Sequence, residues 1–121
     1  MELTSILGSL AYTYFALAIG YNLASIGVKE LTGKALAPTD PMNAIVMMSV
    51  LFLIYSATTI LDTIARTLLM SVFLILIIRY GIFAHVMSYS SDVYHSRLSW
   101  CSAIVINIFG VCVLSLSLIN A

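Results

Sequence analysis

Long apolar runs separated by short polar segments dominate the hydrophobic pattern of this chain. The stretch Asn43 to Leu61 contains no charged residue, and the run from Thr67 to Val86 is interrupted only by Arg79. Such runs suit a membrane, because a helix needs about 20 residues to cross a hydrocarbon layer of roughly 30 Å. They are apolar on every face, whereas barrel strands alternate in polarity over about ten residues. The pattern therefore predicts four transmembrane helices at about residues 3–32, 42–61, 66–87 and 99–119.

Turn signals separate the first two predicted helices but not the second and third. Asp40-Pro41 fits an N-cap residue followed by a proline at the first helical position. Between Ala57 and Thr67 there is neither glycine nor proline. A helix continuous over 42–89 would nevertheless be about 70 Å long and would push one apolar half into water. We therefore expect a tight reversal near Thr58 to Arg66, forced by solvation rather than by turn chemistry.

Composition and charge place the chain in a class. Hydrophobic residues make up 62% of the sequence and charged residues 8%, whereas soluble domains carry roughly 25% charged residues. The formal net charge is zero and no basic cluster is present, so nothing indicates a nucleic-acid partner. We therefore expect an all-α, polytopic integral membrane protein: a single small four-helix domain in contact with membrane lipids.

The distribution of lysine and arginine predicts an orientation. Lys29, Lys34 and Arg97 lie in the first and third expected loops, against Arg66 alone in the second. Cytoplasmic loops carry the excess of positive residues. Both termini are therefore predicted on the non-cytoplasmic side, in a bacterial inner membrane or an organelle membrane.

Arg79 is the residue whose predicted position most needs an explanation. It lies about 12 Å from the expected end of its helix at 1.5 Å per residue, where an arginine costs roughly 2.5 to 3.5 kcal/mol. Asn22 and Asn107 fall at comparable depth in the first and last helices. We expect these three residues to form a polar layer, with Tyr21 and Tyr80 at its rim.

Two interpretations of this layer remain open. In the first, Arg79 bonds amides and carbonyls to set helix register, or slides to the interface. In the second, it meets an anionic or carbonyl-bearing ligand: a lipid phosphate, a quinone or a carboxylate of another subunit. The interior of the four spans contains no acidic residue, which favours a partner outside the chain. No cofactor is required by the sequence, and a bound lipid or quinone is compatible with it.

Small residues at helical spacing predict two packing stripes. Such stripes let helix backbones approach closely within lipid. The stripe on the first helix is expected to meet either a neighbour in the same chain or another subunit, and the stripe on the last helix is expected to be a packing face. The stripes consist of Ala16, Gly20 and Ala24, and of Ala103, Gly110 and Ser117.

Metal binding is weakly indicated. His85, Asp92 and His95 supply two imidazoles and a carboxylate, which are chemically suitable ligands. Their spacing has no special status, and interfacial or solvated histidines explain them better than a metal site does. We therefore expect no metal site.

The function expected from the sequence follows mainly from excluding other classes of protein. No nucleophile and base pair, Schiff-base lysine or phosphate-binding glycine loop is recognisable, so we do not expect an enzyme acting on its own. The main hypothesis is a small accessory subunit that packs with other membrane subunits in an electron-transfer, oxygenase or transport assembly. The alternative is a homo-oligomeric channel or small transporter whose path is lined by Arg79.

Overall fold

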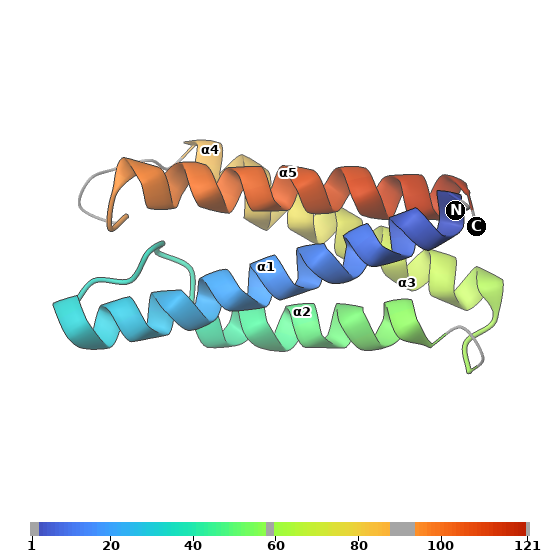
Figure 1. Cartoon of the computed structure of the whole chain (residues 1–121), viewed down its shortest axis with the longest axis horizontal. Coiled ribbons are helices and arrows are strands. Elements are labelled where there is room, and N and C mark those ends of the chain that lie inside the picture. The colour runs from blue at the N-terminus through green and yellow to red at the C-terminus, as the bar shows by residue number, and fades with distance from the viewer. Residues whose placement is uncertain (1–2, 58–59, 88–93, 121) are drawn as a thin grey trace.

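The computed structural model describes residues 3–57, 60–87 and 94–120. In this part of the chain the regular elements are all helices, without strands, and Figure 1 shows the helices lying side by side. The third rod runs from α3 through a π-helical segment, η1, into α4. The elements are α1 (Leu3–Thr32), α2 (Pro41–Ser56), α3 (Thr63–Leu76), η1 (Ile77–Phe83), α4 (Ala84–Met87) and α5 (Arg97–Ile119).

The prediction of a small all-α membrane bundle is confirmed. Three helices are long and apolar enough to cross a membrane: Ser5–Thr32, Thr63–Met87 and Arg97–Ile119. The remaining rod, α2, is apolar but has only 16 residues, fewer than the roughly 20 that a full crossing needs. The predicted end of this helix at residue 61 was therefore wrong, since α2 ends at Ser56.

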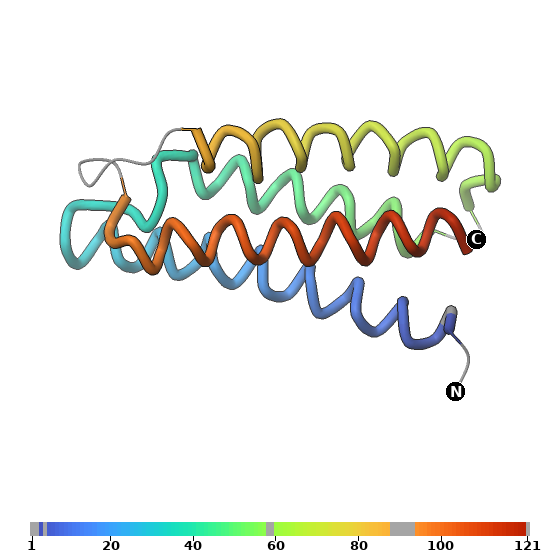
Figure 2. Tube along the Cα trace, turned by 90° about the horizontal axis from the view of Figure 1, so that it is seen from above, coloured from blue at the N-terminus to red at the C-terminus, as the bar shows by residue number. Residues whose placement is uncertain are grey.

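The rods are arranged so that the bundle is closed at one end and open at the other. Helix α1 packs against α2 and α5, and α5 packs in turn against η1. Helix α2 contacts α3, but it does not contact η1 or α4. Both views place the two termini and the α2–α3 turn at the same end of the bundle (Figures 1 and 2). The opening therefore lies towards the opposite end, where α1 leads into α2.

Close contact between α1 and α5 depends on Gly110. A Cβ atom at this position would lie 2.3 Å from the ring of Tyr14, far inside van der Waals contact. The Tyr14 side chain is fully buried, and its hydroxyl donates a hydrogen bond to Asn107 Oδ1 at 3.2 Å. The core around this contact joins residues of all the rods, including Ala11, Phe15, Leu51, Met70, Ile77 and Leu114.

The connection between α1 and α2 folds back along the bundle. Gly33 ends α1 with φ of 81°, a conformation that glycine adopts without strain. The Leu36 N–H then donates to Ser25 Oγ at 3.0 Å, and the Leu36 carbonyl accepts from Ser99 Oγ at 2.8 Å. The Asp40 carboxylate accepts from the Met42 N–H at 3.0 Å, which confirms the predicted N-cap. Helix α2 therefore begins well inside the length spanned by α1.

The turn between α2 and α3 is stabilised by two charged side chains. Asp62 caps α3 by accepting a hydrogen bond from the Ala65 N–H at 2.8 Å. Arg66 caps α2, because its Nε and Nη2 donate to the Tyr55 carbonyl at 3.2 and 2.8 Å. The guanidinium also lies 5.2 Å from the centre of the Tyr55 ring. The chain thus reverses direction in the expected region, and side-chain capping stabilises a turn that has neither glycine nor proline.

Replacing Arg66 tests this cap. Arg66→Met removes both hydrogen bonds to the Tyr55 carbonyl, and bonds to charged groups contribute about 1.5–3 kcal/mol. We expect the free energy of unfolding in detergent to fall by about that amount. Lys29→Met is the matched control, because Lys29 is an exposed cation in the last turn of α1 and should contribute about 1 kcal/mol or less. Equal effects of the two substitutions would contradict the capping role.

Candidate functional site

A cavity of about 280 Å³ occupies the open half of the bundle. It lies between α2 and η1, and α1 and α5 complete its walls. Pockets that hold small molecules typically start at about 300 Å³, so this cavity suits a head group or ring rather than a whole lipid. Its lining comprises Ala18, Tyr21 and Asn22 of α1; Thr39, Asp40, Asn43, Ala44, Met47 and Met48; Ile77, Tyr80, Gly81 and His85; and Ala103, Ile106 and Asn107 of α5.

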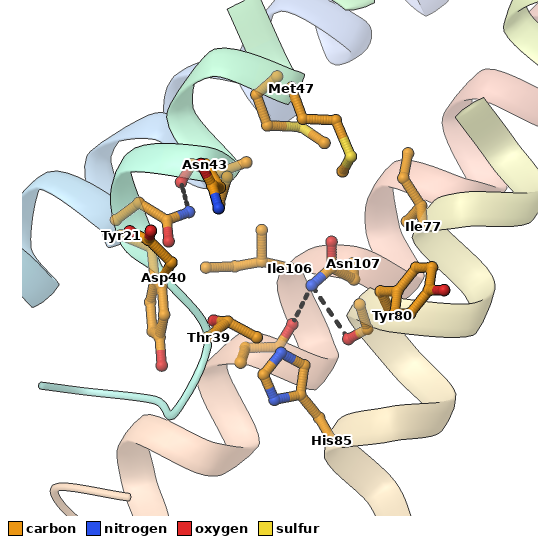
Figure 3. A pocket seen from close by; sticks show the side chains of 16 residues that line it. Tyr21, Thr39, Asp40, Asn43, Met47, Ile77, Tyr80, His85, Ile106 and Asn107 are labelled. Atoms are coloured by element: carbon orange, nitrogen blue, oxygen red, sulfur yellow. Dashed lines mark hydrogen bonds between the residues drawn. The ribbon is translucent and has the colours of Figure 1, made fainter.

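The lining is polar towards the open end of the bundle, where α1 leads into α2, and apolar deeper in the bundle. We call this end the loop end. Asp40 and Asn43 begin α2 at the loop end, while Met47 lies one turn further along this helix. Figure 3 shows His85 on the opposite wall, with Ile106 between the two sides. The cavity therefore suits an amphiphilic molecule whose polar part points towards the loop end.

Asn107 holds η1 against α5. Its Nδ2 donates to the carbonyls of Gly81 at 3.1 Å and Ala103 at 2.8 Å (Figure 3). Its Oδ1 accepts the bond from Tyr14, so every hydrogen-bonding group of the amide is engaged. A Cβ atom on Gly81 would lie 2.8–3.0 Å from the Asn107 side chain. Only a glycine fits here without displacing the amide that joins three helices.

His85 is fixed in the cavity wall. Only 5% of its surface is exposed, and its Nδ1 lies 2.6 Å from the Tyr94 hydroxyl. Its carbonyl accepts a hydrogen bond from Trp100 Nε1 at 2.6 Å. No described residue bonds its Nε2. The imidazole therefore presents a positioned and unused nitrogen to the cavity.

Four of the five residues expected in the polar layer line this cavity, and Arg79 does not. Tyr21 donates to the Ser99 carbonyl at 2.8 Å, and Asn22 Nδ2 donates to the Ala18 carbonyl at 2.8 Å. Arg79 is exposed on the outer face of η1, with its guanidinium 5.3 Å from the centre of the Tyr80 ring. Within the described part of the chain its guanidinium makes no hydrogen bond or ion pair. Asn107 thus satisfies its amide without Arg79, and Asn22 bonds one of its two amide protons within its own helix, so the expected layer is not formed in that way.

The two stripes of small residues face different surroundings. On α5, Ala103 and Gly110 are buried and Ser117 is half-buried, its hydroxyl lacking a hydrogen-bond partner among the described residues. On α1, the stripe of Ala16, Gly20 and Ala24 is exposed, and no atom lies within 4 Å of a Cβ built on Gly20. The α1 stripe therefore does not pack against a helix of the same chain. Contact with another subunit remains a prediction.

The three weak metal candidates are not brought together by the described structure. His85 is buried in the cavity wall, while His95 is exposed and its N–H donates to the Leu36 carbonyl at 3.3 Å. Asp92 lies outside the described residues. Among the residues described, no three histidine, cysteine or acidic side chains gather as a metal site would require.

Sequence reasoning missed His85 as a cavity residue and Asp40 as a residue of the cavity mouth. Asp40 was recognised only as an N-cap, whereas the bonds of Leu36 to Ser25 and Ser99 fold the preceding connection back and bring it into the bundle. His85 carries no local signal of its position. Its orientation depends on Tyr94 and Trp100, which lie across the connection to α5.

Comparisons with known proteins supply no relative. The chain matches no protein-family model, and no curated protein or solved structure is significantly similar to it. The functional argument therefore depends on the geometry described above.

Gly81→Ala tests whether the close approach of η1 and Asn107 supports the site. The added methyl group must displace the amide, and overpacking of this kind typically costs about 1–3 kcal/mol. We expect a fall of that order in the free energy of unfolding, followed by circular dichroism in detergent. Gly27→Ala is the matched control: nothing lies within 4 Å of its Cβ position, so better helix propensity should leave stability equal or raise it by up to about 1 kcal/mol. Equal responses would show that the contact carries no strain.

Proposed function

We propose that this protein is a small accessory subunit that packs within a larger multi-subunit membrane complex and is not catalytic on its own. The observation that carries the proposal is the outward position of Arg79. An electron-transfer, oxygenase or transport assembly is the expected setting. The positive residues at the loop end, Lys29, Lys34 and Arg97, favour a cytoplasmic location for that end.

Insertion of Arg79 at its depth in the span has a high free-energy cost. It precedes Met87, the last residue of α4, by eight positions, or about 12 Å of α-helical rise. An uncompensated arginine at the centre of a span costs roughly 2.5–3.5 kcal/mol. Its described contact is the Tyr80 ring, and none of the described carboxylates forms an ion pair with it. A carboxylate or phosphate supplied from outside the chain would offset this cost.

The exposed stripe on α1 gives a second surface suited to a partner. Ala16, Gly20 and Ala24 leave the backbone accessible, and transmembrane helices associate through such small-residue faces. Helix α1, which carries this stripe, does not pack against η1, which carries Arg79, so the two surfaces belong to separate elements of the bundle. A subunit with two separate contact faces can join neighbours, as a scaffolding subunit does.

A homo-oligomeric channel or small transporter is the alternative, and the position of Arg79 defines its form. Because Arg79 lies outside the bundle, a path lined by it would have to form between copies of the chain. Cross-linking of purified protein would then yield oligomers of identical subunits, and Arg79→Ala would abolish anion flux into liposomes. Flux that is unchanged by this substitution would exclude the channel.

Arg79→Leu separates a partner contact from a tolerated arginine. Leucine removes the cost of inserting the charge, so the isolated bundle should be as stable as the wild type or more so. Loss of one member of a buried ion pair costs about 3–5 kcal/mol, so recovery of the chain in a complex should fall at least tenfold. The measurement is native electrophoresis after mild detergent extraction, beside thermal unfolding of the purified chain. Unchanged recovery of a stable variant would contradict a role for Arg79 in assembly.

Gly20→Leu tests the second face independently. A leucine would hold a partner helix away while leaving the bundle intact, because the position has no neighbours within the chain. We expect reduced co-purification and unchanged thermal stability. Cys112→Leu places the same side chain at an exposed position of α5 and should alter neither. If the wild type migrates as a lone bundle in native electrophoresis, without any co-purifying subunit, the accessory-subunit proposal is contradicted.

A further inference from the structure

The cavity contains polar groups that the fold does not use. His85 Nε2 has no described partner, although its ring is almost completely buried. Asn22 donates one of its two amide protons to the Ala18 carbonyl, which leaves the second. Both residues line the cavity, so these groups are available to bond a ligand with matching acceptors.

The hydrogen bond to Tyr94 determines which proton His85 offers. A phenol is a stronger acid than a neutral imidazole N–H, so we assign the Tyr94 hydroxyl as the donor to Nδ1 across 2.6 Å. The proton of the neutral imidazole then resides on Nε2. His85 therefore presents a hydrogen-bond donor to the cavity, and it suits a carbonyl oxygen.

The charge of the lining argues against an anionic ligand. No lysine or arginine is among the described residues of the wall, and Asp40 is its one charged side chain. Arg79, the cation that could have met a lipid phosphate, faces away from the cavity. Because burying an unpaired anion costs several kcal/mol, the cavity favours a neutral head group.

The deeper wall favours a flat ring. Met47, Met48 and Ile77 line it together with Ile106, and thioethers make favourable contacts with ring faces and edges. His85 and Asn22 come from α4 and α1, which do not pack against each other, so their free donors approach the cavity from different walls. The gap between α2 and η1 would let an apolar tail pass into the bilayer.

We propose that this cavity binds the ring of a quinone. His85 Nε2 donates a hydrogen bond to one quinone carbonyl. Asn22 Nδ2, on another wall, donates to the second carbonyl. The tail leaves between α2 and η1. The site is formed by this chain alone, so it does not depend on the accessory role proposed above.

Trp100 provides a direct readout of the site. It is the single tryptophan of the chain, and its indole N–H bonds the His85 carbonyl. Quinones quench tryptophan fluorescence at short range. With the full chain in phosphatidylcholine nanodiscs, decylubiquinone should therefore quench Trp100 in a saturable manner.

Two variants and one control test the binding. His85→Phe leaves a carbonyl buried without its donor and should weaken the apparent affinity about tenfold, as expected for loss of roughly 1.4 kcal/mol. Ala44→Leu keeps the His85 bonds but fills the cavity, so saturable quenching should disappear. Ala24→Leu makes the same change on the exposed face of α1 and should bind like the wild type.

Three results would overturn the proposal. The first is quenching that rises linearly and equally in the wild type, Ala44→Leu and Ala24→Leu, which reports partition into lipid. The second is displacement of the quinone by phosphatidylglycerol, which would mean an anionic ligand. The third is displacement by tetraphenylphosphonium with no effect of His85→Phe, which would mean a cation site at Asp40.

Discussion

The amide of Asn107 is the interaction on which the arrangement of the bundle depends. It accepts a hydrogen bond from Tyr14 of α1 and donates to Gly81 of η1 and Ala103 of its own helix. Because Gly81 and Gly110 leave no room for a Cβ atom, both neighbouring helices approach α5 closely. Helices in lipid gain little from burying apolar surface against one another, so close packing and hydrogen bonds must hold them together. The consequence is that η1 is drawn towards α5 and away from α2.

The fold-back of the chain before α2 gives the resulting opening its polar character. The bonds of Leu36 to Ser25 and Ser99 bring Asp40 and the start of α2 into the bundle. Asn43, Ala44, Met47 and Met48, at the start of this helix, then form one wall of the cavity. The π-helical segment on the opposite wall is a geometry that often occurs at functional sites. Polar groups from four rods then surround one cavity.

Inside and outside surfaces of this bundle serve different proposed purposes. Within the cavity, Tyr21 and Asn107 bond groups of the same chain, whereas His85 Nε2 and one amide proton of Asn22 are left for a ligand. Arg79 and the stripe around Gly20 instead face outwards, where only lipid or another protein can meet them. The polar layer expected from helical depth thus divides into an internal site and an external contact, which explains why Arg79 does not bond the asparagines.

The sequence by itself determined the class, the number of apolar rods and the start of α2, because span length and the Asp40-Pro41 cap are local properties. It also predicted that Asn22, Arg79 and Asn107 lie at one depth, with Tyr21 and Tyr80 at the rim, since depth follows from helical rise. The directions of Arg79 and of Ala16, Gly20 and Ala24 were decided only by tertiary structure. In helices that are apolar on every face, no amphipathic pattern marks the inner side. The π-helical turn and the position of the His85 side chain likewise depend on Asn107, Tyr94 and Trp100. These residues lie on or next to α5, so they come close to η1 and α4 only when the helices pack together.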